Sequence, residues 1–136
     1  MQTIVSSATR QIVIGLDRPT VLIGERINPT GKKRFSAALR AGDLEAVRQL
    51  ASSQVEAGAD ILDVNVGASG VNEVALLPEA IRAVMETVEV PLCIDSDNPE
   101  TLAAALRVYE GKPIINSVNG QEGRLQKVLP LAGEYG

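Results

Sequence analysis

The chain has 136 residues, of which 45% are hydrophobic and 22% are charged, the balance of an ordinary globular domain. Its net charge of −4 excludes a broad basic face for nucleic acid, and the absence of histidine excludes His-ligated zinc and triads with an imidazole base. The single cysteine, Cys93, excludes an internal disulfide and is interpreted as an inert core residue. With one Phe, two Tyr and no Trp, the core must consist of Val, Ile, Leu and Ala, which suits parallel strands covered by helices.

The first half of the chain alternates between strand-like and helix-like segments. Residues 11–16 are interpreted as a hairpin strand outside the main sheet, and residues 21–24 as the first strand of that sheet. A polar loop with a basic cluster at 32–34 follows; it is either a solvated loop or a contact for an acidic substrate tail or a partner protein. Apolar residues at helical spacing predict a helix over 44–57, with Asp43 as its N-cap and Gly58 ending it.

The second half repeats this alternation three times. A strand is expected over 61–66, then a helix capped by Asn72 that runs to about residue 88, although Pro78 favours a start a few residues later. A strand over 91–95 precedes a helix that Asn98 and Pro99 open and that runs to about Tyr109. The last unit is a strand over 113–117 and a helix over about 121–135. These βα units predict an α/β domain over residues 1–136 with a parallel sheet, either a barrel or an open doubly wound sheet.

Each predicted sheet strand ends in polar residues. Singly, these could cap turns, pair with neighbours or tie down loops, and the serines have no base beside them. Because ligands of α/β folds bind at the carboxyl ends of the strands, we expect the set to converge on one pocket. Carboxylates and amides with little positive charge disfavour a phosphate site and suit the donor-rich edge of a pterin. The candidate residues are Glu25, Asn28, Asp63, Asn65, Asp95, Ser96, Asn116 and Ser117.

Four segments carry a family resemblance: residues 24–28 (GERIN), 63–67 (DVNVG), 94–96 (IDS) and 115–117 (INS). In order and spacing they resemble the pterin-binding, dihydropteroate-synthase-like methyltransferases, above all methyltetrahydrofolate:corrinoid protein methyltransferases and the folate domain of cobalamin-dependent methionine synthase. The resemblance implies a TIM barrel of eight strands, of which this chain would form the N-terminal half. It also implies methyl transfer between tetrahydrofolate and a corrinoid (cobalamin) protein or domain, with no metal bound by the chain itself.

The resemblance assigns roles within the pocket. Asp95 would accept hydrogen bonds from the pyrimidine edge of the pterin, and Asn116 would bond to the ring beside it. Asp63 and Asn65 would line the same pocket, with Ser96 and Ser117 beside them, while Glu25 and Asn28 would shape its floor and entrance. The catalytic groups near N5 are expected in the second half of the barrel.

Three functions therefore remain open. The leading one is folate-dependent methyl transfer; the others are pterin condensation as in dihydropteroate synthase, and a non-catalytic half-barrel or oligomerising module. A half-barrel would leave two sheet edges and an aliphatic inner face exposed, which favours association with a second copy or a complementary chain. From the lack of a signal peptide and of an apolar run of about 20 residues, we expect a cytoplasmic protein.

Overall fold

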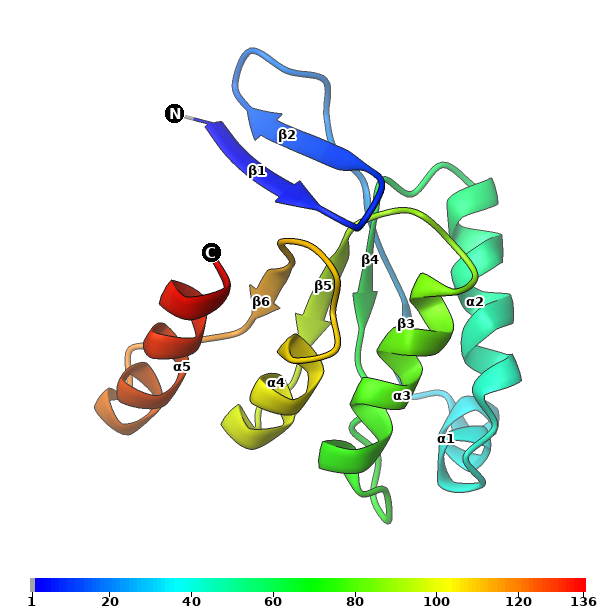
Figure 1. Ribbon diagram of the computed structural model, residues 1–136. Coiled ribbons are helices and arrows are strands. Elements are labelled where there is room, and N and C mark those ends of the chain that lie inside the picture. Colours follow the sequence, from blue (N-terminus) through cyan, green and yellow to red (C-terminus); the bar gives the residue numbers. More distant parts are fainter. Residues whose placement is uncertain (1) are drawn as a thin grey trace.

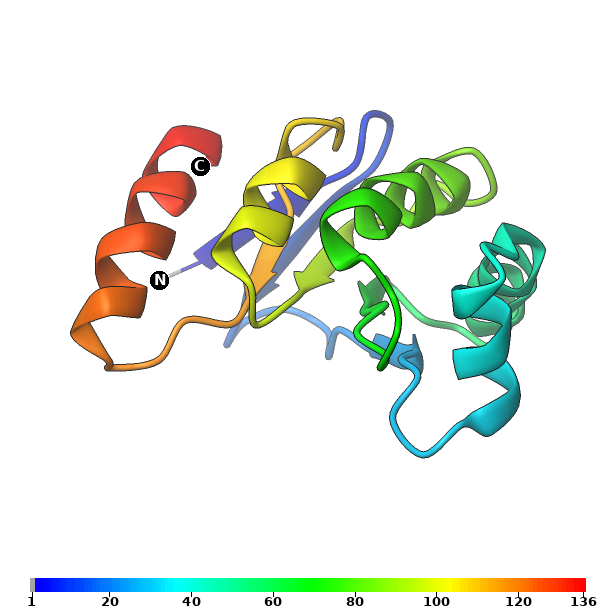
Figure 2. The same ribbon diagram turned by 90° about the horizontal axis from the view of Figure 1, so that it is seen from below.

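The structure, a computed structural model that describes residues 2–136, contains a small hairpin and a four-stranded parallel sheet with helices on one side (Figures 1 and 2). The hairpin pairs β1 with β2 in antiparallel fashion, and the sheet has the order β3-β4-β5-β6. This confirms the predicted α/β class. Among the described residues, no helix has the length and apolarity needed to cross a membrane. The elements are β1 (Gln2–Ser6), β2 (Gln11–Gly15), β3 (Ile23–Ile27), α1 (Lys33–Arg40), α2 (Leu44–Glu56), β4 (Ile61–Val64), α3 (Glu73–Met85), β5 (Leu92–Asp95), α4 (Pro99–Leu106), β6 (Ile114–Asn116) and α5 (Glu122–Tyr135).

The predicted helix caps are confirmed. The side chains of Asp43, Asn72 and Asn98 accept hydrogen bonds from backbone N–H groups in the first turns of α2, α3 and α4, at 3.0, 3.4 and 2.9 Å. The expectation that Pro78 delays the start of α3 is wrong, because α3 begins at Glu73 and includes the proline. The Asn72 cap and the buried apolar face of this helix outweigh the one backbone hydrogen bond that proline removes.

Two elements were not predicted, and one is displaced. The segment expected to be a basic loop contains α1, an eight-residue helix that buries Phe35 and Leu39 four positions apart on one face. The partner of the predicted hairpin strand is β1, of which only Val5 is buried. The first sheet strand begins at Ile23, two residues later than expected, because residues 21–22 lead into the sheet from the hairpin side.

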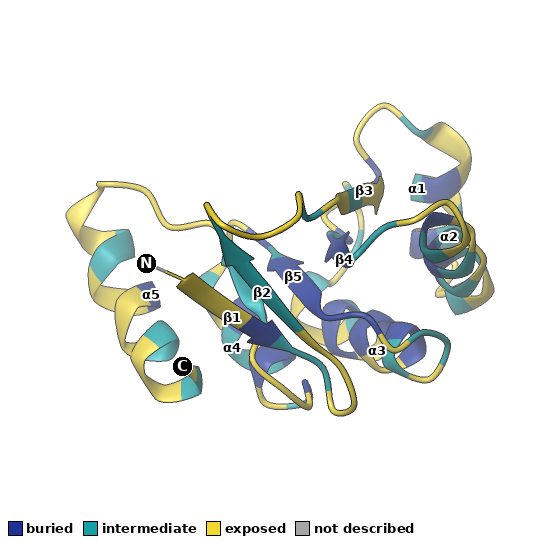
Figure 3. Cartoon of the chain, turned by 90° about the horizontal axis from the view of Figure 1, so that it is seen from above, coloured by how far each residue is buried: buried dark blue, intermediate teal, exposed yellow. Residues whose placement is uncertain are grey.

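The sheet has two unlike faces. Leu62, Val64, Leu92 and Ile94 point to the helices and form the main core with them. On the other face, Ile61, Cys93 and Ile114 lie at or near the start of their strands and pack against Val5, Ile12 and Ile14 of the hairpin. Figure 3 shows the hairpin strands β1 and β2 in front of the sheet. The hairpin covers the apolar start of β4, β5 and β6, whereas Ile23 of β3, which pairs with Ile61, is 44% exposed. The expected exposed aliphatic inner face is therefore limited to the β3 side of the sheet.

The hairpin is fixed at the N-terminal ends of the sheet strands (Figure 1). The hydroxyl of Tyr109 donates to the carbonyl of Ser6 at 2.8 Å and accepts from the N–H of Leu92 at 3.1 Å. Ser6 also exchanges two backbone hydrogen bonds with Lys112, at 2.9 and 3.0 Å. Gly111, at φ +140°, allows this approach, because a side chain there would collide with the Ser6 carbonyl. The opposite, C-terminal ends of the strands stay free of the hairpin.

Candidate ligand site at the strand ends

Three of the predicted site residues share the hairpin-side face of the sheet. Along β4, β5 and β6 this face reads apolar first and polar last: Ile61 then Asp63, Cys93 then Asp95, and Ile114 then Asn116. The strand register aligns Asp63 with Cys93 and Asp95 with Asn116. Since alternate residues of a strand point to the same face, the polar end of each strand projects beyond the hairpin-covered floor.

Two crossed carboxylate–amide pairs join these strands. Asn65 Nδ2 donates to Asp95 Oδ2 at 2.9 Å, and Asn116 Nδ2 donates to Asp63 Oδ2 at 3.0 Å. The orientation of the Asn65 amide is fixed independently, because its Oδ1 accepts from the N–H of Gly67 at 2.7 Å. Oδ1 of Asp95 and the side-chain Oδ1 of Asn116 have no hydrogen-bond partner among the described residues. The site therefore offers acceptors to a ligand whose edge carries N–H groups.

Burial and neighbouring charge distinguish the acidic groups. Asp63 is 3% exposed, whereas Asp95 is about half-buried. Burial raises the pKa of Asp95 above its usual value, and the charges of Asp63, Asp97 and Glu25 raise it further, against the lowering effect of the Asn65 hydrogen bond. An ionised Asp95 is thus under-solvated, which makes it a stronger acceptor for a ligand N–H.

Cys93 forms the floor beneath these groups. It is 4% exposed, and burial, followed by the hydrogen bond and charge of Asp63, raises the pKa of its thiol far above the ordinary value. A thiol held in its neutral form is a poor nucleophile. The interpretation of Cys93 as an inert core residue agrees with this environment.

The other predicted site residues lie elsewhere. Glu25 is exposed on β3, close enough for its charge to affect Asp95 and Cys93. Asn28 closes a local turn, since its side chain accepts from the N–H of Thr30 at 2.9 Å. Ser117 is exposed in the loop after β6.

Ser96 does not join the cluster, contrary to the prediction. It is 2% exposed, donates to Glu73 at 2.9 Å and accepts from the N–H of Asn98 at 3.1 Å. Because it follows Asp95 directly, it lies on the opposite face of the strand and ties the loop after β5 to α3.

Sequence reasoning missed two residues that shape the site. Gln54 of α2 is 7% exposed and accepts from the N–H of Arg26 at 2.8 Å, where the pairing of β3 with β4 shifts register. Arg124 of α5 contacts the backbone of the loops that follow β5 and β6. The isolated Gly24 in a strand pattern was a signal for the first, because it indicates a bulge or a close approach. No local signal marks the second.

Two further features of the described residues bear on where a ligand could bind. No group of three or more His, Cys, Asp or Glu side chains among residues 2–136 could hold a metal ion. A cavity of about 470 Å³ lies between the turn of the hairpin and the ends of α3 and α4, with Ser7, Met85 and Val90 among its lining residues. It is at the hairpin end of the sheet, away from the carboxylate–amide pairs. The strand ends are therefore the one place where predicted site residues come together.

The chain was compared with curated proteins and with solved structures. A methylcorrinoid:tetrahydrofolate methyltransferase of Eubacterium limosum is 37% identical over 114 residues, which are 82% of this chain and 41% of that protein. The methionine synthase of Mycobacterium tuberculosis is 33% identical over 137 residues, 97% of this chain and 12% of that protein. A dihydropteroate synthase from Xanthomonas albilineans, solved with 7,8-dihydropteroate, superposes with a TM-score of 0.54 at 28% identity, over 88% of this chain and 43% of that one.

These matches place the chain in one family. It spans less than half the length of each of these proteins, and the partial coverage of the barrel structure agrees with a half-barrel. The family described as "Pterin binding enzyme" matches residues 24–136, which contain the parallel sheet except for its first residue, Ile23, and every candidate site residue. The chain belongs to the pterin binding enzyme family.

Proposed function

We propose that this chain binds the reduced pterin ring of a folate at the carboxyl ends of β4–β6 and contributes that site to methyl transfer between methyltetrahydrofolate and a corrinoid protein. The observation that carries the proposal is the pair of crossed carboxylate–amide contacts. Asn65 and Asn116 each use one of their two side-chain N–H groups on Asp95 and Asp63, so the free oxygen of Asp95 and Oδ1 of Asn116 stay available as acceptors, beside one N–H of each amide. The pyrimidine edge of a pterin carries an amino group and a ring N–H side by side, which the carboxylate of Asp95 can accept together.

The chemistry assigned to this chain is binding and orientation. Asp95 and Asn116 would hold the ring at the carboxyl ends of β5 and β6, where a partner carrying a corrinoid could approach it. A corrinoid on a partner protein or domain would accept or donate the methyl group, and this chain, without histidine, offers it no imidazole ligand. Holding the two reactants in line supplies a large part of the rate enhancement expected for a group transfer.

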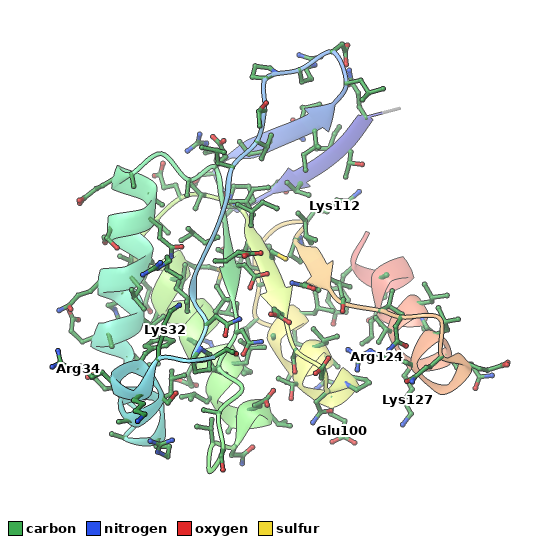
Figure 4. The ribbon with its side chains drawn as sticks, turned by 180° about the vertical axis from the view of Figure 1, so that it is seen from behind. Lys32, Arg34, Glu100, Lys112, Arg124 and Lys127 are labelled. Carbon is green, nitrogen blue, oxygen red and sulfur yellow. The ribbon has the colours of Figure 1, made fainter. Side chains whose placement is uncertain are left out.

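Calorimetric titration with methyltetrahydrofolate and with tetrahydrofolate tests the proposal. We expect wild type to bind, and Asp95→Asn, which keeps the shape and removes the charge, to weaken binding by roughly tenfold to a hundredfold, the value of about 1.5–3 kcal/mol for a charge-assisted contact. Glu100→Gln is the matched control, because it removes one exposed carboxylate from the first turn of α4 (Figure 4) and leaves the strand ends intact. No heat with wild type at high ligand concentration would refute pterin binding by this chain.

Pterin condensation is the second candidate, supported by the superposition on dihydropteroate synthases, with TM-scores of 0.54 and 0.59. The two functions share the pterin pocket and differ in the second substrate. A dihydropterin pyrophosphate together with p-aminobenzoate would give dihydropteroate only under the condensation hypothesis, whereas methyltetrahydrofolate with a methyl-accepting corrinoid protein would react only under the first. The identity of 33–37% to methyl-transferring relatives, against 28% to the synthases, favours methyl transfer.

A further inference from the structure

Arg124 bridges the two loops that carry the candidate pterin contacts. Its Nη2 donates to the carbonyl of Ser117 at 2.8 Å and to that of Ser96 at 3.1 Å, and its Nε also donates to Ser117 at 3.2 Å. Nη1 donates to the carbonyl of Asp97, whose carboxylate lies 3.6 Å from Nη2. The side chain of Arg124 is only 14% exposed, and Figure 4 shows it between α4 and α5.

The contacts of Arg124 lie where the backbone hydrogen bonds between the loop after β5 and strand β6 end. The last hydrogen bond between the loop after β5 and β6 joins the N–H of Ser96 to the carbonyl of Asn116, at 2.9 Å. Beyond this bond, the loops that follow β5 and β6 present carbonyl groups to each other, and carbonyl groups cannot form hydrogen bonds with one another. A guanidinium, with five N–H groups and no acceptor, can hold several carbonyls at once, and the compact ammonium of lysine cannot span the same fork.

From this geometry we infer that Arg124 is a positioning residue for the pterin site, an inference that rests on the proposed function. Two of the three carbonyls that it holds belong to Ser96 and Ser117. Each of these serines directly follows a side chain that would contact the ring, Asp95 or Asn116. Arg124 fixes the spacing of these two side chains through the backbone and does not touch the ligand. Its effect is expected on the affinity for folate, because misplacing a binding group by about 1 Å is costly.

The test compares Arg124→Gln and Arg124→Lys with Lys127→Gln. Lys127 lies on the same helix and is exposed, so its substitution removes the same charge without touching the loops. We expect Arg124→Gln to weaken tetrahydrofolate binding by about tenfold or more. Arg124→Lys should restore little of this affinity, and Lys127→Gln should leave it unchanged.

A spectroscopic signature separates positioning from a purely structural role. In ¹H–¹⁵N spectra of the ligand-free protein, the side-chain amide resonances of Asn116 and Asn65 report their hydrogen bonds to Asp63 and Asp95. We expect Arg124→Gln and Arg124→Lys to shift the Asn116 resonances, and Lys127→Gln to leave both amides in place. If Arg124→Gln fails to fold, Arg124→Lys carries the same comparison.

The possible outcomes are distinguishable. A folded Arg124→Gln variant with wild-type affinity and an unshifted Asn116 amide would overturn the inference, even if it unfolds at a lower temperature. If wild type binds no folate, the proposed function fails. The amide resonances of Asn116 then still decide whether Arg124 sets the position of that side chain.

Discussion

The contact between Gln54 and β3 allows a quantitative test of how the first sheet strand is held. Gln54 Oε1 accepts from the N–H of Arg26 at 2.8 Å, and its Nε2 donates to the carbonyl of Leu50 at 3.1 Å. A Cβ atom at Gly24 would lie 2.6 Å from the same Oε1 and 3.1 Å from Leu62 Cδ2. A side chain at position 24 would therefore displace the amide of Gln54 from its hydrogen bond with the N–H of Arg26.

The two sites should be strongly coupled. Gln54→Ala leaves the part-buried N–H of Arg26 without its acceptor, and we expect a loss of about 1–3 kcal/mol in the free energy of unfolding. Gly24→Ala in the wild type displaces Oε1 and so breaks the same hydrogen bond, at a similar cost. In the Gln54→Ala background the obstructing oxygen is gone, and Gly24→Ala should cost under about 1 kcal/mol, for the remaining contact with Leu62.

Urea unfolding followed by circular dichroism at 222 nm measures this cycle, since the chain has no Trp for fluorescence. We expect the double variant to be about 1–2 kcal/mol more stable than the sum of the two single losses predicts. Additive losses would refute the reasoning, because they would mean that Gly24 and Gln54 act on β3 independently. A change in the slope with urea would instead report an altered denatured state.

The remaining predictions concern titratable side chains. Burial raises the pKa of Tyr109 to about 12, so the contribution of this residue to stability is complete below about pH 10 and is lost as the pH rises towards 12. In urea unfolding, Tyr109→Phe should remove this loss of stability between about pH 10 and 12. The variant should also cost about 1–3 kcal/mol at neutral pH, because the N–H of Leu92 loses its acceptor. Cys93, whose pKa is raised by burial, should react with Ellman's reagent only after unfolding; fast labelling of the native protein would contradict its placement in the floor. Burial also raises the pKa of Asp95, so its ionisation opposes folding as the pH rises through that value; Asp95→Asn should raise the thermal midpoint at pH 7, and the gain should shrink below about pH 4.

The sequence predicted features that repeat along the chain and missed those that depend on a single distant contact. The prediction that Asp63, Asp95 and Asn116 lie together rested on their place at the carboxyl ends of successive parallel strands. In the structure they share one face, because side chains of a strand point to opposite faces in turn. The same rule, applied one residue further, would have put Ser96 on the other face, and the prediction erred by treating adjacent residues as one group. The helix caps were predictable because an Asn or Asp cap bonds within its own turn.

The missed side-chain contacts join side chains to backbone groups of other elements, whereas the missed helix α1 is a local feature with Phe35 and Leu39 on its buried face. Tyr109 bonds to the carbonyl of Ser6, Gln54 to the N–H of Arg26, and Arg124 to the carbonyls of Ser96 and Ser117. Every residue carries backbone hydrogen-bonding groups, so the sequence does not indicate to which of them a distant side chain will bond. The strand β1 was not predicted for a related reason. It is mostly exposed, and its pairing with β2 depends on the contact of the hairpin with the sheet.

The unequal burial of the two carboxylates implies a division of roles that can be tested directly. Asp63 is 3% exposed and holds the Asn116 amide, whereas Asp95 is half-buried and pairs with an asparagine that Gly67 fixes independently. Asp63→Ala should therefore cost about 1–3 kcal/mol of stability, because it leaves a part-buried amide unpaired, and should weaken folate binding indirectly. Asp95→Ala should weaken binding with little loss of stability. Equal stability losses in urea unfolding, or unchanged folate affinity in Asp95→Ala, would mean that the roles are not divided in this way. The register aligns Asp63 with Cys93, two residues before Asp95, so Asp95 lies closer to the carboxyl ends of the strands. Its larger expected effect on folate binding follows from this position.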